Sequence, residues 1–187
     1  LLIWWAIEAQ AESGRDELLA LVRDPAVWQS KIFSTHTAER IGRRFTADQG
    51  PRKYFTLKEG VYSEWLIERA PEYFRRNLDY CGRLLEAAAN DAAVATLLAG
   101  MAKGMSGGRV ESVPPLLREA IVRAWESGAH YATLVTFAAR LGLPAAMSEA
   151  VSALRRGGLP EPDQQALLDL FTATAEPEAL PVIATLV

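Results

Sequence analysis

The chain is poor in the residues that build most compact metal and redox sites, since its 187 residues include one cysteine and two histidines. A single cysteine excludes an internal disulfide, a thiolate zinc site and haem attachment through a C-x-x-C-H motif. His36 and Glu39 have helical spacing, but zinc needs further ligands and His130 is distant in sequence. We therefore expect no metal site, and we expect Cys81 to be a buried, inert thiol.

Motifs for nucleotide binding and nucleophilic catalysis are missing as well. The sequence contains no G-x-x-x-x-G-K-[ST], G-x-G-x-x-G or G-x-S-x-G pattern. Gly104, Gly107 and Gly108 lack the strand and the lysine of a phosphate loop, so we interpret them as a flexible linker. The carboxylates are spread along helix faces. We expect no catalytic residue, no cofactor and no enzymatic activity from this chain.

Long apolar runs and a basic net charge are also absent. No apolar segment approaches the roughly 18 residues of a membrane-spanning helix. The opening LLIWWAIEA is too short to span, and no basic region precedes it as in a signal peptide. It begins in mid-helix, so we expect a piece of a longer protein. The net charge of −3 and pI near 5.5 argue against general binding of nucleic acid.

Helical periodicity dominates what is present, and it repeats after 33 residues near the C-terminus. Pro144, Met147, Ala150, Val151 and Leu154 correspond to Pro177, Leu180, Ile183, Ala184 and Val187, and Leu134, Val135, Phe137 and Ala138 correspond to Leu167, Leu168, Leu170 and Phe171. A repeat of this length is typical of stacked helix pairs, whose apolar faces are buried only against neighbouring units. We expect one all-α domain over residues 1–187, with antiparallel neighbours.

Capping residues and prolines predict where the helices begin. Ser13 is the expected cap of the second helix, Asp24-Pro25 opens a short turn, and Asn90 or Asp91 caps a later helix. Pro71 is expected to end a helix. The expected helices are at about 2–11, 13–22, 32–45, 61–69, 72–89, 90–105, 114–127, 130–141, 144–156, 162–173 and 177–187.

The segment at about 46–71 interrupts this rhythm, and residues 40–58 hold six basic residues and one acidic residue. We expect an irregular insertion, with a short extended piece at 54–57. Its aromatic and basic residues favour a solvated insertion that the aromatics hold against the helices, and the alternative is a surface for an acidic partner or an adjoining domain. Adjacent tryptophans cannot both face one core, so one is expected to be exposed. The candidate partner-binding residues are Arg43, Arg44, Arg52, Lys53, Tyr54, Phe55, Trp4 and Trp5.

One family resemblance rests on the N-terminal segments LLIWWAIE, AESGRD, DPAVW and ERIGRRF. In these segments the chain resembles the helical-repeat region of the large membrane-bound dehydrogenases of planctomycetes and their relatives. The C-terminal segments LPAAMSEAVSALRR and PEALPVIATLV are similar to HEAT repeats. The resemblance covers most of the chain and implies a HEAT/ARM-like α-α superhelix, a right-handed solenoid of antiparallel helix pairs.

The resemblance also implies a role. In that family a β-propeller precedes the repeats, a c-type cytochrome domain follows them, and the protein is exported to the periplasm or beyond. This chain carries none of the redox motifs, so the resemblance implies a non-catalytic scaffold and spacer that docks adjacent domains or another protein. One alternative is a free-standing HEAT-type protein-binding module. A nucleic-acid-binding helical-repeat enzyme would need a basic concave face, which the composition disfavours.

Overall fold

The structure is a computed structural model that describes residues 2–11, 13–47, 64–105, 110, 112–127 and 131–184. Within these ranges every regular element is a helix and no strand occurs, which confirms the predicted all-α class. The α-helices are α1 (Leu2–Gln10), α2 (Arg15–Arg23), α3 (Pro25–Trp28), α4 (Ala38–Thr46), α5 (Glu64–Ala87), α6 (Asp91–Gly104), α7 (Pro115–Ser127), α8 (Tyr131–Arg140), α9 (Pro144–Arg156), α10 (Glu161–Thr174) and α11 (Leu180–Ile183). A π-helical turn, η1 (Phe33–Thr37), precedes α4, and a 3₁₀ turn, η2 (Pro177–Ala179), precedes α11.

Most of the predicted helix starts are confirmed. Asp24 accepts a hydrogen bond from the backbone N–H of Ala26 at 2.9 Å and caps α3. Asn90 accepts one from the backbone N–H of Ala93 at 2.9 Å and caps α6. Each cap satisfies a backbone donor that the first turn of a helix leaves unpaired. Pro144 opens α9 at the predicted residue because a proline at the first helical position has no N–H to satisfy.

Two predictions about helix ends are wrong. Gly14, rather than Ser13, occupies the cap position of α2, because Ser13 belongs to the turn that closes α1 and donates its hydroxyl to Gln10 Oε1 at 3.0 Å. Pro71 does not end a helix, since α5 continues through this position from Glu64 to Ala87. An interior proline removes one backbone hydrogen bond and crowds the carbonyl four residues back, at a cost of about 3 kcal/mol, and α5 runs through Pro71 despite that cost.

The irregular segment predicted at about 46–71 is therefore shorter than expected. Thr46 is the last residue of α4, and residues 64–71 belong to α5. Residues 48–63, which include the extended piece predicted at 54–57, lie outside the described residues.

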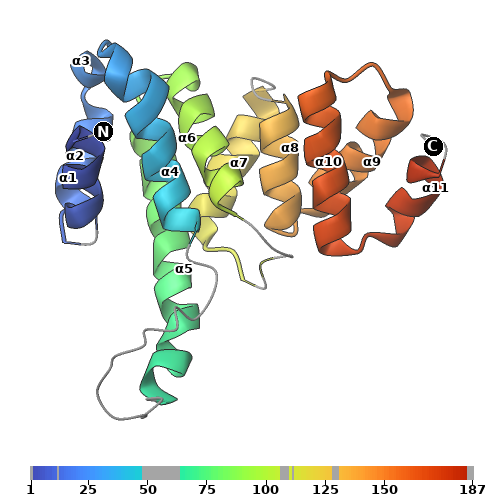
Figure 1. Cartoon of the computed structure of the whole chain (residues 1–187), viewed down its shortest axis with the longest axis horizontal. Coiled ribbons are helices and arrows are strands. Elements are labelled where there is room, and N and C mark those ends of the chain that lie inside the picture. The colour runs from blue at the N-terminus through green and yellow to red at the C-terminus, as the bar shows by residue number, and fades with distance from the viewer. Residues whose placement is uncertain are drawn as a thin grey trace.

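The helices pack in two rows that follow the order of the chain. In one row α4 contacts α6, α6 contacts α8, and α8 contacts α10. The other row is in two parts: α2 contacts α5 and α5 contacts α7, and α9 contacts α11. Contacts of α4 with α5 and of α8 with α9 join the rows. Figure 1 shows the helices side by side along the longest axis, with the first part of α5 extending beyond its neighbours.

Glycines allow the closest of these contacts. A Cβ atom added to Gly42 of α4 would collide with the Leu97 carbonyl oxygen of α6, and one added to Gly100 would collide with the Glu39 carbonyl oxygen of α4. A Cβ on Gly104 would meet Thr46, whose hydroxyl donates to the Met101 carbonyl oxygen at 2.9 Å. The backbones of α4 and α6 therefore lie in direct contact, and Gly104 serves this contact rather than the predicted linker.

One hydrophobic core runs the length of the described chain, from Ala11 to Val182. In the first helix of the predicted 33-residue repeat, Leu134 and Phe137 are buried as their counterparts Leu167 and Leu170 are, whereas Val135 is buried and its counterpart Leu168 only partly so. The second helix differs, because Leu180 is 66% exposed where its counterpart Met147 is 8% exposed. The tighter 3₁₀ turn of η2 changes the helical phase, so that Ala179 and Val182 are buried in the last helix instead.

Candidate functional site

The predicted partner-binding residues are only partly described. Arg43 and Arg44 share the last turn of α4, while Arg52, Lys53, Tyr54 and Phe55 lie outside the described residues. The Arg40 guanidinium carbon of α4 lies 5.8 Å from the ring centroid of Trp4 on α1, whereas Trp5 of α1 is 69% exposed. The expectation that the two tryptophans face different environments is confirmed. The described part of the predicted surface is thus an arginine pair and one exposed indole.

Arg15, Tyr80 and Asn77 hold α2 against the core. The Arg15 guanidinium carbon lies 5.1 Å from the Phe45 ring centroid and 5.0 Å from that of Tyr80, within the range of cation–π attraction. Arg15 also donates to Asn77 Oδ1 at 2.5 Å, and the Tyr80 hydroxyl donates to the Arg15 carbonyl oxygen at 2.7 Å. These contacts join α2, α4 and α5, so the cluster has a structural role.

Cys81 lies beside this cluster and is fully buried, as predicted. Burial raises the pKa of its thiol to about 12, and the Arg15 guanidinium opposes that shift. Burial also raises the pKa of the Tyr80 phenol, again against the effect of Arg15. Neither group is ionised near neutral pH, so neither is an activated nucleophile or base there.

The His36 and Glu39 pair is not brought into a metal site. Glu39 accepts a hydrogen bond from Lys103 Nζ at 3.0 Å, which ties α4 to α6. His36 lies exposed on η1. Within the described ranges no three His, Cys, Asp or Glu side chains are grouped as metal ligands. The same ranges include no helix with both the length and the apolar character needed to cross a membrane.

Two hollows are described on the protein surface. The first is a groove of about 350 Å³ across α6, α8 and α10, which are consecutive in one row. Small side chains form much of it, a cation stands on each of α6 and α8, and two carboxylates stand on α10. Its lining comprises Ala99, Ala102 and Lys103 of α6, Ala132, Thr133, Thr136 and Arg140 of α8, and Pro162, Asp163, Ala166 and Asp169 of α10. We call it the α6–α8–α10 groove.

Arg140 fixes the geometry of this groove. The side chain is 9% exposed, and its Nη1 donates to the Met105 carbonyl oxygen beyond the end of α6 at 2.6 Å. Burial lowers the pKa of its guanidinium, and the Asp169 carboxylate opposes that shift. Asp169 also accepts a hydrogen bond from Gln165 Nε2 at 2.8 Å. Charged groups of α8 and α10 are therefore held in place before any partner binds.

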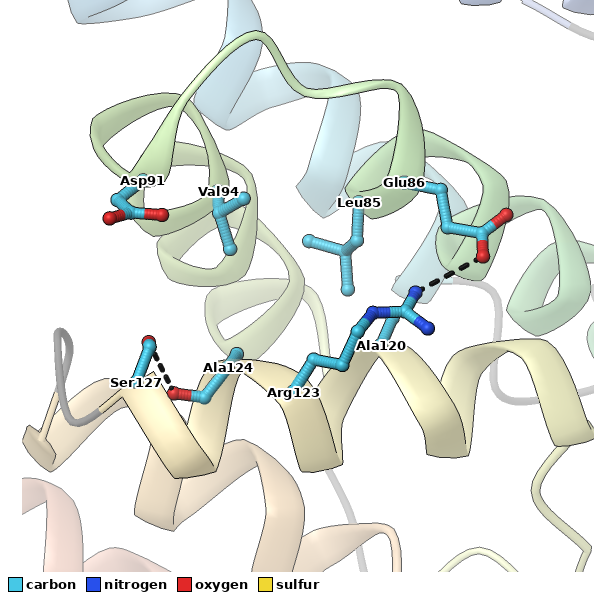
Figure 2. A pocket seen from close by; sticks show the side chains of 8 residues that line it. All are labelled: Leu85, Glu86, Asp91, Val94, Ala120, Arg123, Ala124 and Ser127. Atoms are coloured by element: carbon cyan, nitrogen blue, oxygen red, sulfur yellow. Dashed lines mark hydrogen bonds and ion pairs between the residues drawn. The ribbon is translucent and has the colours of Figure 1, made fainter.

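The second hollow is a pocket of about 470 Å³ where the end of α5 and the start of α6 meet α7 (Figure 2). Its lining comprises Leu85, Glu86, Asp91, Val94, Ala120, Arg123, Ala124 and Ser127. Arg123 Nη2 lies 3.1 Å from Glu86 Oε1. The described lining of both hollows includes no histidine or cysteine.

Neither hollow was anticipated from the sequence. Each combines side chains from three helices, and which helix faces meet depends on packing that no local pattern encodes. The sequence did contain one signal for the groove, an alanine on each of α6, α8 and α10. These residues, which the structure shows to be half-exposed, are Ala102, Ala132 and Ala166.

Comparison with known proteins found no family model, no curated protein and no solved structure that matches the chain.

Proposed function

We propose that the chain is a right-handed solenoid of HEAT/ARM-like helix pairs that acts as a non-catalytic scaffold, with the α6–α8–α10 groove as its docking surface for a partner polypeptide. The observation that carries the proposal is that three consecutive helices of one row build the groove together. A stack of helix pairs presents such an extended surface because each unit contacts only its neighbours.

The groove's chemistry suits an extended peptide segment. Ala99, Ala132 and Ala166 leave room for a backbone to approach the helices closely. Lys103 stands on one wall and Asp163 on another, so a bound segment meets both signs of charge. Paired charges of this kind select register and partner more than they add affinity.

A library of random peptides displayed on phage, selected against the folded chain, tests the docking function. Enriched peptides are then measured by fluorescence anisotropy against an Ala166→Trp variant, whose indole fills the groove. We expect at least about a tenfold loss of affinity, since a filled groove removes the contact surface. Thr172→Trp, at an exposed position of the same helix, is the matched control and should bind as the unmodified chain does.

Two results count against the proposal. One is the failure of any peptide to be enriched over an unrelated helical protein. The other is that enriched peptides bind the Ala166→Trp variant as tightly as they bind the control. Circular dichroism of both variants shows whether a loss of binding reflects loss of fold.

The more specific role implied by the family resemblance, a spacer between a propeller and a cytochrome domain, stays a prediction. Its test is the full reading frame that encodes this chain. A propeller sequence upstream and a C-x-x-C-H motif downstream would support it, and their absence would leave the free-standing docking module.

A further inference from the structure

The pocket between α5, α6 and α7 carries a second, separate inference. We propose that it binds an aliphatic primary ammonium group, the chemistry shared by a lysine side chain and a free diamine. The proposal rests on the cavity, on the apolar surface inside it and on the distribution of charge around it. It does not depend on the α6–α8–α10 groove.

The middle of the pocket is apolar and suits an alkyl stem. Leu85, Ala120 and Ala124 are buried in the core yet contribute to the lining, and Val94 is partly exposed beside them. In Figure 2 these side chains lie between the polar groups at the two ends of the pocket. An unbranched chain of methylene groups laid on this surface would be removed from water together with it.

The charge balance of the pocket selects a cation. Glu86 is already neutralised by Arg123, whose Nη2 lies 3.1 Å from its carboxylate. Asp91 is exposed and forms no ion pair within the described part of the chain, so the described side chains of the lining carry one negative charge in excess. A compact ammonium on a flexible stem matches a single carboxylate, whereas a guanidinium is suited to a bidentate partner.

A second acceptor stands at the same end of the pocket. Figure 2 shows Ser127 of α7 facing the end where Asp91 of α6 lies, with Glu86 and Arg123 at the other end. The Ser127 hydroxyl donates its proton to the Ala124 carbonyl oxygen at 2.9 Å. Its oxygen lone pairs are therefore directed to accept, and an ammonium, which only donates, fits a carboxylate and such a hydroxyl.

Titrations followed by ¹H–¹⁵N NMR test this proposal with three probes. Nα-acetyl-lysine methylamide carries the ammonium, Nα-acetyl-norleucine methylamide keeps a similar stem without it, and 1,5-diaminopentane is the free diamine. We expect the lysine probe to bind in the millimolar range, with shift changes at Val94, Ala120 and Ala124. The norleucine probe should not saturate. Tighter binding of the lysine probe than of the diamine indicates a protein partner, and the reverse indicates a free amine.

Three variants assign the effect to its residues. Asp91→Asn should weaken the lysine probe by about threefold to tenfold, the range of one partly exposed charged contact. Arg123→Gln should strengthen it, since this change releases the Glu86 carboxylate. Asp16→Asn, which removes an exposed first-turn carboxylate from α2, is the matched control and should change nothing. Equal affinity for the norleucine probe, or unchanged affinity in both Asp91→Asn and Arg123→Gln, would overturn the proposal.

Discussion

Gly100→Ala is the sharpest test of the direct contact between α4 and α6. The new Cβ would lie against the Glu39 carbonyl oxygen, 2.7 Å from the Glu39 carbonyl carbon and 3.0 Å from the Arg43 nitrogen. All three atoms belong to the backbone of α4, so no side chain can rotate to relieve the overlap. The helices must separate, which also strains the hydrogen bond from Thr46 to Met101.

The expected magnitude follows from three opposing contributions. Alanine is favoured over glycine in a helix by about 1 kcal/mol. Overpacking against a surface that cannot rearrange costs about 3 kcal/mol, and weakening the Thr46 hydrogen bond costs about 1 kcal/mol. We therefore expect a net loss of about 3 kcal/mol in the free energy of unfolding, measured by urea denaturation followed by circular dichroism.

The sign of the change in the free energy of unfolding shows whether overpacking or helix propensity dominates at Gly100. Ala92→Gly, at an exposed position of the same helix, reports helix propensity alone and should lose about 1 kcal/mol or less. If Gly100→Ala instead stabilises the protein by a similar amount, propensity governs the site and the close approach of α4 to α6 is refuted.

Two further predictions concern the core. Because burial raises the pKa of Cys81 to about 12, its un-ionised thiol stabilises the fold fully up to about pH 9, and this contribution is lost as the pH rises toward 12. Stability should fall over that interval, less steeply in Cys81→Ala, and the thiol should react with a disulfide reagent only after unfolding. Leu134→Ala should cost about 2–5 kcal/mol because Leu134 is buried, and Leu168→Ala should cost less because Leu168 is only partly buried. A larger loss at Leu168 in a thermal or urea melt would contradict the assigned faces.

The boundaries of the helices were largely readable from local chemistry. Asn90, Pro115 and Pro144 act through their own backbone or side chain, so their effect appears wherever the sequence places them. The prediction at Ser13 failed because Ser13 belongs to the turn that closes α1, which leaves Gly14 as the residue that directly precedes α2. At Pro71 the local rule fails, because α5 runs through the proline from Glu64 to Ala87.

The arrangement of the helices was harder to predict from the sequence. Gly100 and Gly104 are separated by three residues, a spacing that permits close helix contact, yet only packing reveals that they lie against Glu39 and Thr46 of α4. The groove and the pocket depend on which helices cross, and their residues are far apart in sequence. Of the predicted surface, Arg43, Arg44, Trp4 and Trp5 are described, and their role in partner binding stays a prediction.

The wide turn of η1 contains one residue more than a turn of α-helix. A residue could therefore be deleted there without changing which side chains face the core. There the Ala38 backbone N–H donates to the Phe33 carbonyl oxygen, five residues back instead of the usual four. The eight residue-to-residue steps from Phe33 to Ile41 thus occupy the two turns that take about seven steps in an ordinary α-helix. Deleting one residue in this turn would leave Phe33 and Ile41 directed at the same core, whereas a deletion within α4 would rotate Phe45 away from it.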